Sequence, residues 1–204
     1  MTTAANIDRG EPAPSPPNPM QPVVLDRFDR PAFKANAIID HMLDAGPLDM
    51  NKLALMEASR EDREQFAQLI GYSVGGFCEL SYVSDEACER AYAMADALAA
   101  GDTAPAGHPR QPLVVGADGL IRFKRNAVVA ALLKAFEASR KPLDKDAFAD
   151  AEWEQLLQLR GATAAEFAAS PHASKEAIDD MKSAISNLCV AAGIASYDGG
   201  RIAP

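Results

Sequence analysis

The sequence predicts a mainly α-helical protein with short β-hairpins, arranged as two tandem homologous helical units that each contain a helix-turn-helix-like pair of helices. Segments of sequence recur at an offset of 90 residues, and apolar side chains recur at the spacing of one buried helical face. The composition agrees with this fold class, because aromatic residues make up only 6% of a chain that is rich in alanine, the best helix former.

The recurring segments define the domain organisation. Phe33–Ala37 is matched by Phe123–Ala127, and Glu64–Gly71 is matched by Glu154–Gly161. The prediction is a flexible proline-rich arm over residues 1–20, a first unit over 21–100, a linker over 101–110, a second unit over 111–193 and a loosely held tail over 194–204. The second unit also serves as a control for each motif: a function that both units share requires the same residues at the corresponding positions of both.

Each unit is expected to open with a short hairpin. In the second unit, Pro112–Val115 and Leu120–Phe123 flank a turn that contains Asp118 and Gly119, residues that favour tight turns. In the first unit Asp26–Asp29 takes the place of the turn, and Pro31 weakens the second strand because proline has no N–H group to donate.

Polar residues mark where the helices begin. Asn36 and Asn126 precede helices whose apolar residues fall at 38, 39, 42 and 43 and at 128, 129, 132 and 133. Further caps are expected at Asp49, before a helix over Met50–Glu57, and at Ser59, before a helix that reaches Ile70. The residues expected to begin the remaining helices are Ser73, Thr163, Ser84 and Ser174. Gly71 and Gly161 are expected in the left-handed conformation that ends a helix.

The composition excludes several classes of function. A net charge of −9 disfavours broad binding to a nucleic-acid backbone, which needs a basic surface. Cys78, Cys88 and Cys189 have no metal-binding spacing and no counterpart in the other unit, so we expect buried reduced thiols. No apolar run could span a membrane and no cofactor motif is present, so the expectation is a cytoplasmic protein without cofactor or metal.

Gly71–Gly75 matches the G-x-S-x-G pattern of hydrolases, with Ser73 as the nucleophile. That motif requires a preceding strand in a large α/β sheet, whereas a helix is expected here, and the second unit does not keep the pattern. A helix cap explains Ser73 with fewer assumptions. We therefore expect no enzyme.

Phe66–Phe77 resembles the helix, glycine turn and second helix of bacterial repressors, so a nucleic-acid-binding regulator is the alternative function. The second helix, Val74–Leu80, offers none of the Arg, Lys, Asn or Gln side chains that contact base edges. The cluster Arg122, Lys124 and Arg125 is the only basic patch; it is either a solvated edge or a contact for phosphate or an acidic partner.

The segment Gly71–Ser84 is the strongest candidate for a binding surface. Two adjacent glycines near a helix start are costly and make sense where another backbone approaches closely. The apolar residues that follow either pack on the core or form a surface for a partner. The predicted protein-binding residues are Gly75, Gly76, Phe77, Glu79, Leu80 and Tyr82.

Asn51–Ala54 together with Glu61–Asp85 resembles a family of small uncharacterised bacterial and bacteriophage proteins. The resemblance covers about residues 21–95, and it implies a fold unit and a bacterial or phage setting without an assigned activity. The sequence thus leads to the hypothesis of a non-catalytic interaction or scaffold protein that binds a protein partner mainly through its first unit.

Overall fold

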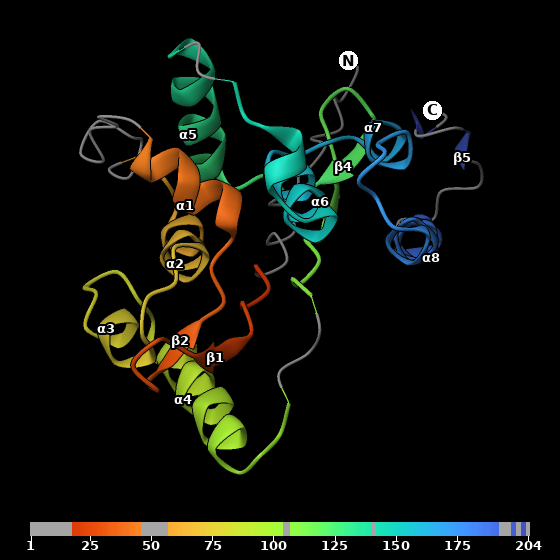
Figure 1. Ribbon diagram of the computed structural model, residues 1–204. Helices are drawn as coiled ribbons and strands as arrows, with labels where there is room; N and C mark the ends of the chain where they lie inside the picture. The colour runs from red at the N-terminus through yellow and green to blue at the C-terminus, as the bar shows by residue number, and fades with distance from the viewer. Residues whose placement is uncertain are drawn as a thin grey trace, which may run out of the picture.

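The computed structural model describes residues 18–45, 57–103, 107–139, 142–191, 197–198 and 201–202 (Figure 1). These residues form a mainly helical structure with short antiparallel hairpins. Residues 1–17 of the expected arm, and the expected helix over Met50–Glu57 apart from its last residue, lie outside the described residues.

The described residues 18–103, called here the first half, contain a hairpin and four helices. Their bounds are β1 (Val23–Leu25), β2 (Pro31–Phe33), α1 (Ala37–Asp44), α2 (Arg60–Leu69), α3 (Val74–Cys78) and α4 (Asp85–Ala99). Strand β2 begins at Pro31, which pairs with Leu25 at the end of the hairpin next to the turn.

Residues 107–191, the second half, contain elements of the same kinds in the same order. They are β3 (Leu113–Val115), β4 (Ile121–Phe123), α5 (Ala127–Ala138), a 3₁₀ turn η2 (Lys145–Ala147), α6 (Asp150–Leu159), α7 (Ala164–Ala168) and α8 (Lys175–Ala191). The expected loose tail contains a further two-stranded pairing of β5 (Tyr197–Asp198) with β6 (Arg201–Ile202).

The helix caps expected from the sequence are confirmed wherever the structure describes them. The side-chain oxygen of Ser59 accepts from the N–H group of Asp62, and Thr163 and Glu166 form a full capping box. Gly71 and Gly161 adopt φ of +76° and +82°, a conformation that costs a side chain free energy. The added Cβ of an alanine would lie 3.2 Å from Ala35 Cβ in the first case.

Tertiary contacts recur between the two halves at corresponding positions. The backbone N–H of Gln21 donates to Gln68 Oε1 at 2.9 Å, and that of Gln111 donates to Gln158 Oε1 at 2.8 Å. Similarly, edge-to-face ring pairs join Phe33 to Phe77 and Phe123 to Phe167, with centroids 4.9 and 4.8 Å apart. These contacts attach each hairpin to the helices of its own half.

The apolar core has three parts. Helices α1, α2, α5 and α6 share a central cluster that includes Ile38, Phe66, Val129 and Leu159, so each half supplies two helices to a common core. One outer cluster joins the β1–β2 hairpin to α3 and α4, and the other joins β3–β4 to α7 and α8. Figure 1 shows the four central helices between these two outer groups.

Two buried asparagines tie the halves together through reciprocal bonds. Asn36 caps α1 through Oδ1 and donates from Nδ2 to Gln155 Oε1 at 2.8 Å and to the Glu152 carbonyl at 3.2 Å. Asn126 caps α5 and donates from Nδ2 to Gln65 Oε1 at 2.9 Å and to the Asp62 carbonyl at 3.0 Å. Both asparagines are fully buried, so these bonds form away from water.

Residues of the predicted arm and linker are packed against the helical halves, although the sequence suggests that they have little to bury. Met20, expected in the flexible arm, packs against the first outer cluster. His108, expected in a linker with little to bury, has a side chain that is only 3% exposed. Its ring lies between the halves, with Nδ1 3.0 Å from Gln21 Oε1 and Nε2 3.0 Å from Glu152 Oε1.

None of the helices in the described ranges is long and apolar enough to cross a membrane.

Replacing Asn36 with alanine should lower the free energy of unfolding by about 2–4 kcal/mol, because it removes a cap worth about 1 kcal/mol and leaves Gln155 Oε1 without its donor in the core. Asn126→Ala should cost a similar amount. Urea unfolding followed by circular dichroism measures both. The control is Ser84→Ala, which removes only a cap and should cost about 1 kcal/mol; equal losses in all three variants would contradict the structural role of the asparagines.

Candidate functional site

The structure separates the six predicted binding residues into core and surface. Phe77 is fully buried against Phe33 and therefore contributes to packing and does not reach the surface. Leu80 is half-buried and packs on the same outer cluster. Glu79 is exposed at the end of α3, and Tyr82 is half-buried in the loop that leads to α4. Only part of the predicted set is therefore available to a partner.

The two glycines of α3 differ in their surroundings. A Cβ atom added to Gly76 would lie 3.1 Å from Ser73 Oγ, so the helix cap crowds that position. A Cβ atom added to exposed Gly75 would meet no described atom within 4 Å. The close approach of another backbone, expected from the sequence, is thus not found at Gly75 among the described residues, and the glycine leaves open space instead.

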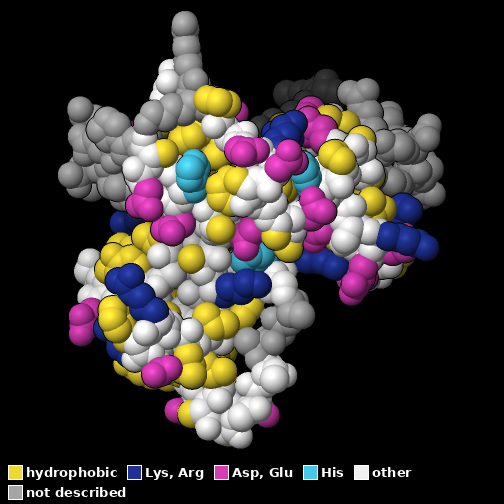
Figure 2. All heavy atoms as spheres, viewed as in Figure 1, with side chains coloured by type: hydrophobic (Ala, Val, Ile, Leu, Met, Phe, Trp, Pro, Cys, Tyr) yellow, Lys and Arg dark blue, Asp and Glu magenta, His cyan; other side chains and the backbone are white. Residues whose placement is uncertain are grey.

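That open space belongs to a shallow apolar groove of about 410 Å³ between β2, α3 and α4. Its walls are Arg30, Pro31, Ser73, Val74, Gly75, Tyr92, Ala95, Asp96 and Ala99. In Figure 2 hydrophobic side chains gather over this lower part of the molecule, where α3, α4 and the first hairpin lie. The charged residues that line the groove are Arg30, which pairs with Asp26 at 2.8 Å, and Asp96.

Sequence reasoning missed Tyr92, which completes the groove. The alanines at 87, 91 and 95 are buried and mark the core-facing side of α4. Tyr92 lies off that side and keeps 50% of its surface exposed. A large aromatic residue outside the buried face of an amphipathic helix was the available signal.

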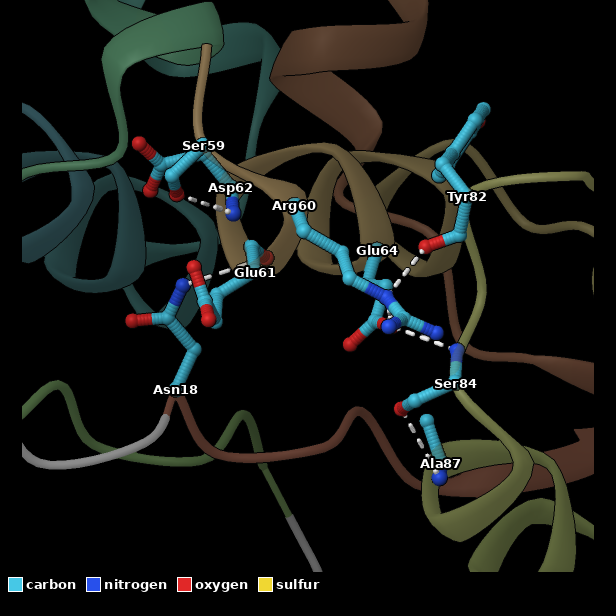
Figure 3. A network of polar contacts seen from close by, with 9 residues as sticks. All are labelled: Asn18, Ser59, Arg60, Glu61, Asp62, Glu64, Tyr82, Ser84 and Ala87. Atoms are coloured by element: carbon cyan, nitrogen blue, oxygen red, sulfur yellow. Dashed lines mark hydrogen bonds and ion pairs between the residues drawn. The ribbon is translucent and has the colours of Figure 1, made fainter.

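A polar network fixes the loop between α3 and α4 to α2 (Figure 3). Arg60 Nε donates to the Tyr82 carbonyl at 2.9 Å and to Glu64 Oε1 at 3.2 Å. Glu64 Oε1 also accepts from the backbone N–H of Ser84 at 2.6 Å, and Ser84 in turn caps α4. These bonds hold the loop residues in one position relative to the groove-forming helices.

Tyr82 is packed beneath a guanidinium group. Arg63 lies over its ring at 5.2 Å from the centroid, a cation–π contact. Partial burial raises the pKa of the Tyr82 hydroxyl, because desolvation disfavours the phenolate. Tyr82 is therefore a neutral hydrogen-bonding group at neutral pH.

The expectation that all three cysteines are reduced is wrong for two of them. Cys78 at the end of α3 and Cys88 in α4 form a disulfide, with Cα atoms 5.3 Å apart. Cys189 is a buried free thiol, as expected. The sequence did not reveal the pair because α3 and α4 must first pack together to bring positions ten residues apart within bonding distance.

Helix α3 follows α2 after a short turn, but it lacks the base-reading groups of a DNA-binding helix. The exposed or half-exposed positions of α3 are Gly75, Gly76 and Cys78, followed by Glu79. None of them can donate to a base edge as Arg, Lys, Asn or Gln does. In the basic cluster of the second half, Arg122 pairs with Asp118 in the same hairpin.

The surroundings of Ser73 are those of a helix cap. Its hydroxyl oxygen accepts from the Gly76 N–H at 3.2 Å, and helix α2 precedes it where a nucleophile elbow needs a strand. The partners found for His108 and His172 are Gln21, Glu152 and Asp150, and Ser73 is not among them. No group of three or more His, Cys, Asp or Glu side chains that could hold a metal ion is present in the described part of the chain.

No protein-family model matches the chain, and neither a curated protein nor a solved structure matches it. The resemblance of residues 21–95 to the bacterial and bacteriophage family stays a prediction.

Reduction of the Cys78–Cys88 bond should lower the free energy of unfolding by about 2–3 kcal/mol, because a short loop between α3 and α4 is no longer closed in the unfolded chain. Guanidinium unfolding with and without dithiothreitol measures the difference. The double variant Cys78→Ala/Cys88→Ala is the control and should not respond to the reductant. A wild-type curve that the reductant leaves unchanged would show that the bond is absent.

Proposed function

We propose that this chain is a non-catalytic interaction protein that binds a protein partner through the groove between β2, α3 and α4. The observation that carries the proposal is an apolar groove, open above Gly75, that no described residue fills. The exposed large aromatic residues of the described chain, Phe28, Tyr72 and Tyr92, all belong to the first half, which contains the groove. Solvated apolar surface of this kind is typical of sites that bind other proteins.

The groove favours an extended apolar segment of the partner, proline-rich or aliphatic. Tyr92 supplies an aromatic wall of the kind that extended proline-containing peptides pack against. The space above Gly75 accommodates a side chain of the partner. Because most of the groove is lined by residues of β2, α3 and α4, which are already hydrogen-bonded elements, binding needs little ordering of this surface.

We further infer that the two halves are tandem copies of one unit, the second of which has lost the partner surface. The recurring bonds of Gln21 and Gln111 and the recurring ring pairs support a common origin of the scaffold. The position of Gly75 is taken by Ala165 in the second half, and that of Tyr92 by Lys182. The scaffold is thus kept while the proposed surface differs.

The proposed setting is the cytoplasm of a bacterium or of a phage-infected cell. The Cys78–Cys88 disulfide is the observation against the cytoplasm, where such bonds are rare. Alkylation of thiols in host cells lysed directly into denaturant, which exposes the buried Cys189, tests this: three labelled cysteines are expected in a reducing compartment, and one in an oxidising compartment.

Gly75→Ala and Tyr92→Ala should reduce capture of the native partner from host extract at least tenfold, because the first places a methyl group in the space that the partner side chain occupies and the second removes the aromatic wall. Gly75→Ala should leave the fold intact or stabilise it by up to about 1 kcal/mol, since alanine favours a helix and the space is open. Quantitative mass spectrometry of the captured proteins, with circular dichroism of each variant, measures both effects.

Lys182→Ala, at the corresponding position of the second half, is the matched control and should capture the partner as the wild type does. Equal capture by all variants would contradict the proposed surface. Retardation of DNA or RNA in a low-salt mobility-shift assay, lost on addition of salt, would instead support the nucleic-acid-binding alternative.

A further inference from the structure

Two polar pockets occupy corresponding positions in the two halves. The first lies between α2, the start of α4 and Asn18–Pro19, and the second lies between α6, the start of α8 and Gly107–Arg110. Their volumes are about 270 and 300 Å³, far more than the roughly 30 Å³ of a single water molecule. Figure 3 shows the wall of the first pocket around Asn18, Arg60 and Glu64.

A buried glutamine lines each pocket, and its orientation is fixed by the rest of the fold. Asn36 must accept helix N–H groups through Oδ1, so its Nδ2 is the donor and Gln155 Oε1 the acceptor. Asn126 likewise accepts through Oδ1 and donates through Nδ2, so Oε1 of Gln65 is the acceptor. Because both amides are oriented by these bonds, exchanging their oxygen and nitrogen would lose a bond in each case.

This orientation leaves one donor unmet in each half. Gln65 and Gln155 are each 1% exposed, and the Nε2 atom of each has no hydrogen-bond partner among the described residues. A buried N–H group without an acceptor costs free energy. Each pocket therefore presents an amide donor that an acceptor atom of a ligand would satisfy.

Two carboxylates recur at corresponding positions of the pockets, and acidic residues outnumber arginines in both, since Arg60 and Arg90 line the first pocket and Arg110 lines the second. Glu64 and Glu154 line the first and second pocket, and so do Glu86 and Glu176. Glu64 uses Oε1, and Glu154 uses Oε2, to accept from the backbone N–H groups of Ser84 and Ser174, which precede α4 and α8. The other oxygen of each carboxylate can accept from a ligand. Repeated negative charge disfavours an anion and attracts a cation.

We propose that each pocket binds a small protonated amine that also carries hydroxyl groups. The ammonium group contacts the Glu64 or Glu154 carboxylate, and a hydroxyl oxygen accepts from Gln65 or Gln155 Nε2. An amino sugar or an amino alcohol has this combination of groups and a size that the pocket volumes admit. This site is separate from the partner groove, which lies on the other part of α4 and on α3.

The second pocket is the stronger site. In the first pocket Arg60 lies 3.2 Å from Glu64 and competes with a bound cation for that carboxylate. The corresponding residue in the second pocket is Asp150, a carboxylate that pairs with His172 at 2.8 Å. Arg110, which also lines this pocket, pairs with Asp180 and not with Glu154. Two classes of site with different affinities are therefore expected in one chain.

Titration of the full chain with glucosamine, followed by the ¹⁵N–¹H signals of the glutamine side chains, tests the proposal. Glucosamine should shift the amide signals of Gln155 at lower concentration and those of Gln65 at higher concentration. Glucose has the same ring without the ammonium group and should bind at least tenfold more weakly, and glucuronate should not bind.

Glu154→Gln should weaken glucosamine binding at the tighter site at least tenfold, and Glu64→Gln should do the same at the weaker site. In each variant the affinity of the other site should be unchanged. Each substitution keeps an amide oxygen for the helix N–H group, so the fold is retained. Glu89→Gln, an exposed change on α4 outside both pockets, is the control. Amide signals that no glucosamine concentration shifts would mean that the pockets hold water only. Equal binding of glucose, or unchanged binding in a variant that combines Glu64→Gln with Glu154→Gln, would equally overturn the proposal.

Discussion

The arrangement of the whole molecule depends on the reciprocal hydrogen bonds of Asn36 and Asn126. Each asparagine caps its own helix with its oxygen and reaches the other half with its nitrogen. Since both side chains are fully buried, a bond lost on either side leaves a polar group without water. The two halves are therefore fixed in one relative position, and the four central helices pack as one core.

This constraint leaves the outer elements free to differ. The hairpin with α3 and α4 in the first half, and its counterpart in the second, each have their own apolar cluster. In the first half that outer group has the groove, Tyr92 and the Cys78–Cys88 bond, whereas Ala168 and Ile178 stand at the positions corresponding to the cysteines. The hydrogen bonds of Asn36 and Asn126 also orient Gln155 and Gln65, which line the paired pockets. The same two asparagines therefore determine both the packing of the halves and the orientation of the pocket amides.

The candidate site was predicted from the sequence only in part. The region around α3 was found because adjacent glycines in a helix are locally costly, and Gly75 does line a groove. Phe77 could not be assigned to the core beforehand, because its burial depends on Phe33 in a distant hairpin. Tyr92 and Pro31 join the groove only through packing of α4 and β2 around α3.

The sequence by itself determined the local structure: helix starts at Asn36, Ser59 and Ser84, and helix ends at Gly71 and Gly161. These features depend on bonds and backbone angles within a few residues, which local sequence encodes. Only the tertiary structure decided that the cap residues also join the halves, that His108 is buried between them and that Cys78 meets Cys88. Each of those contacts joins residues that lie in separate elements of the chain, and their approach is set by the packing of helices, which no local pattern specifies.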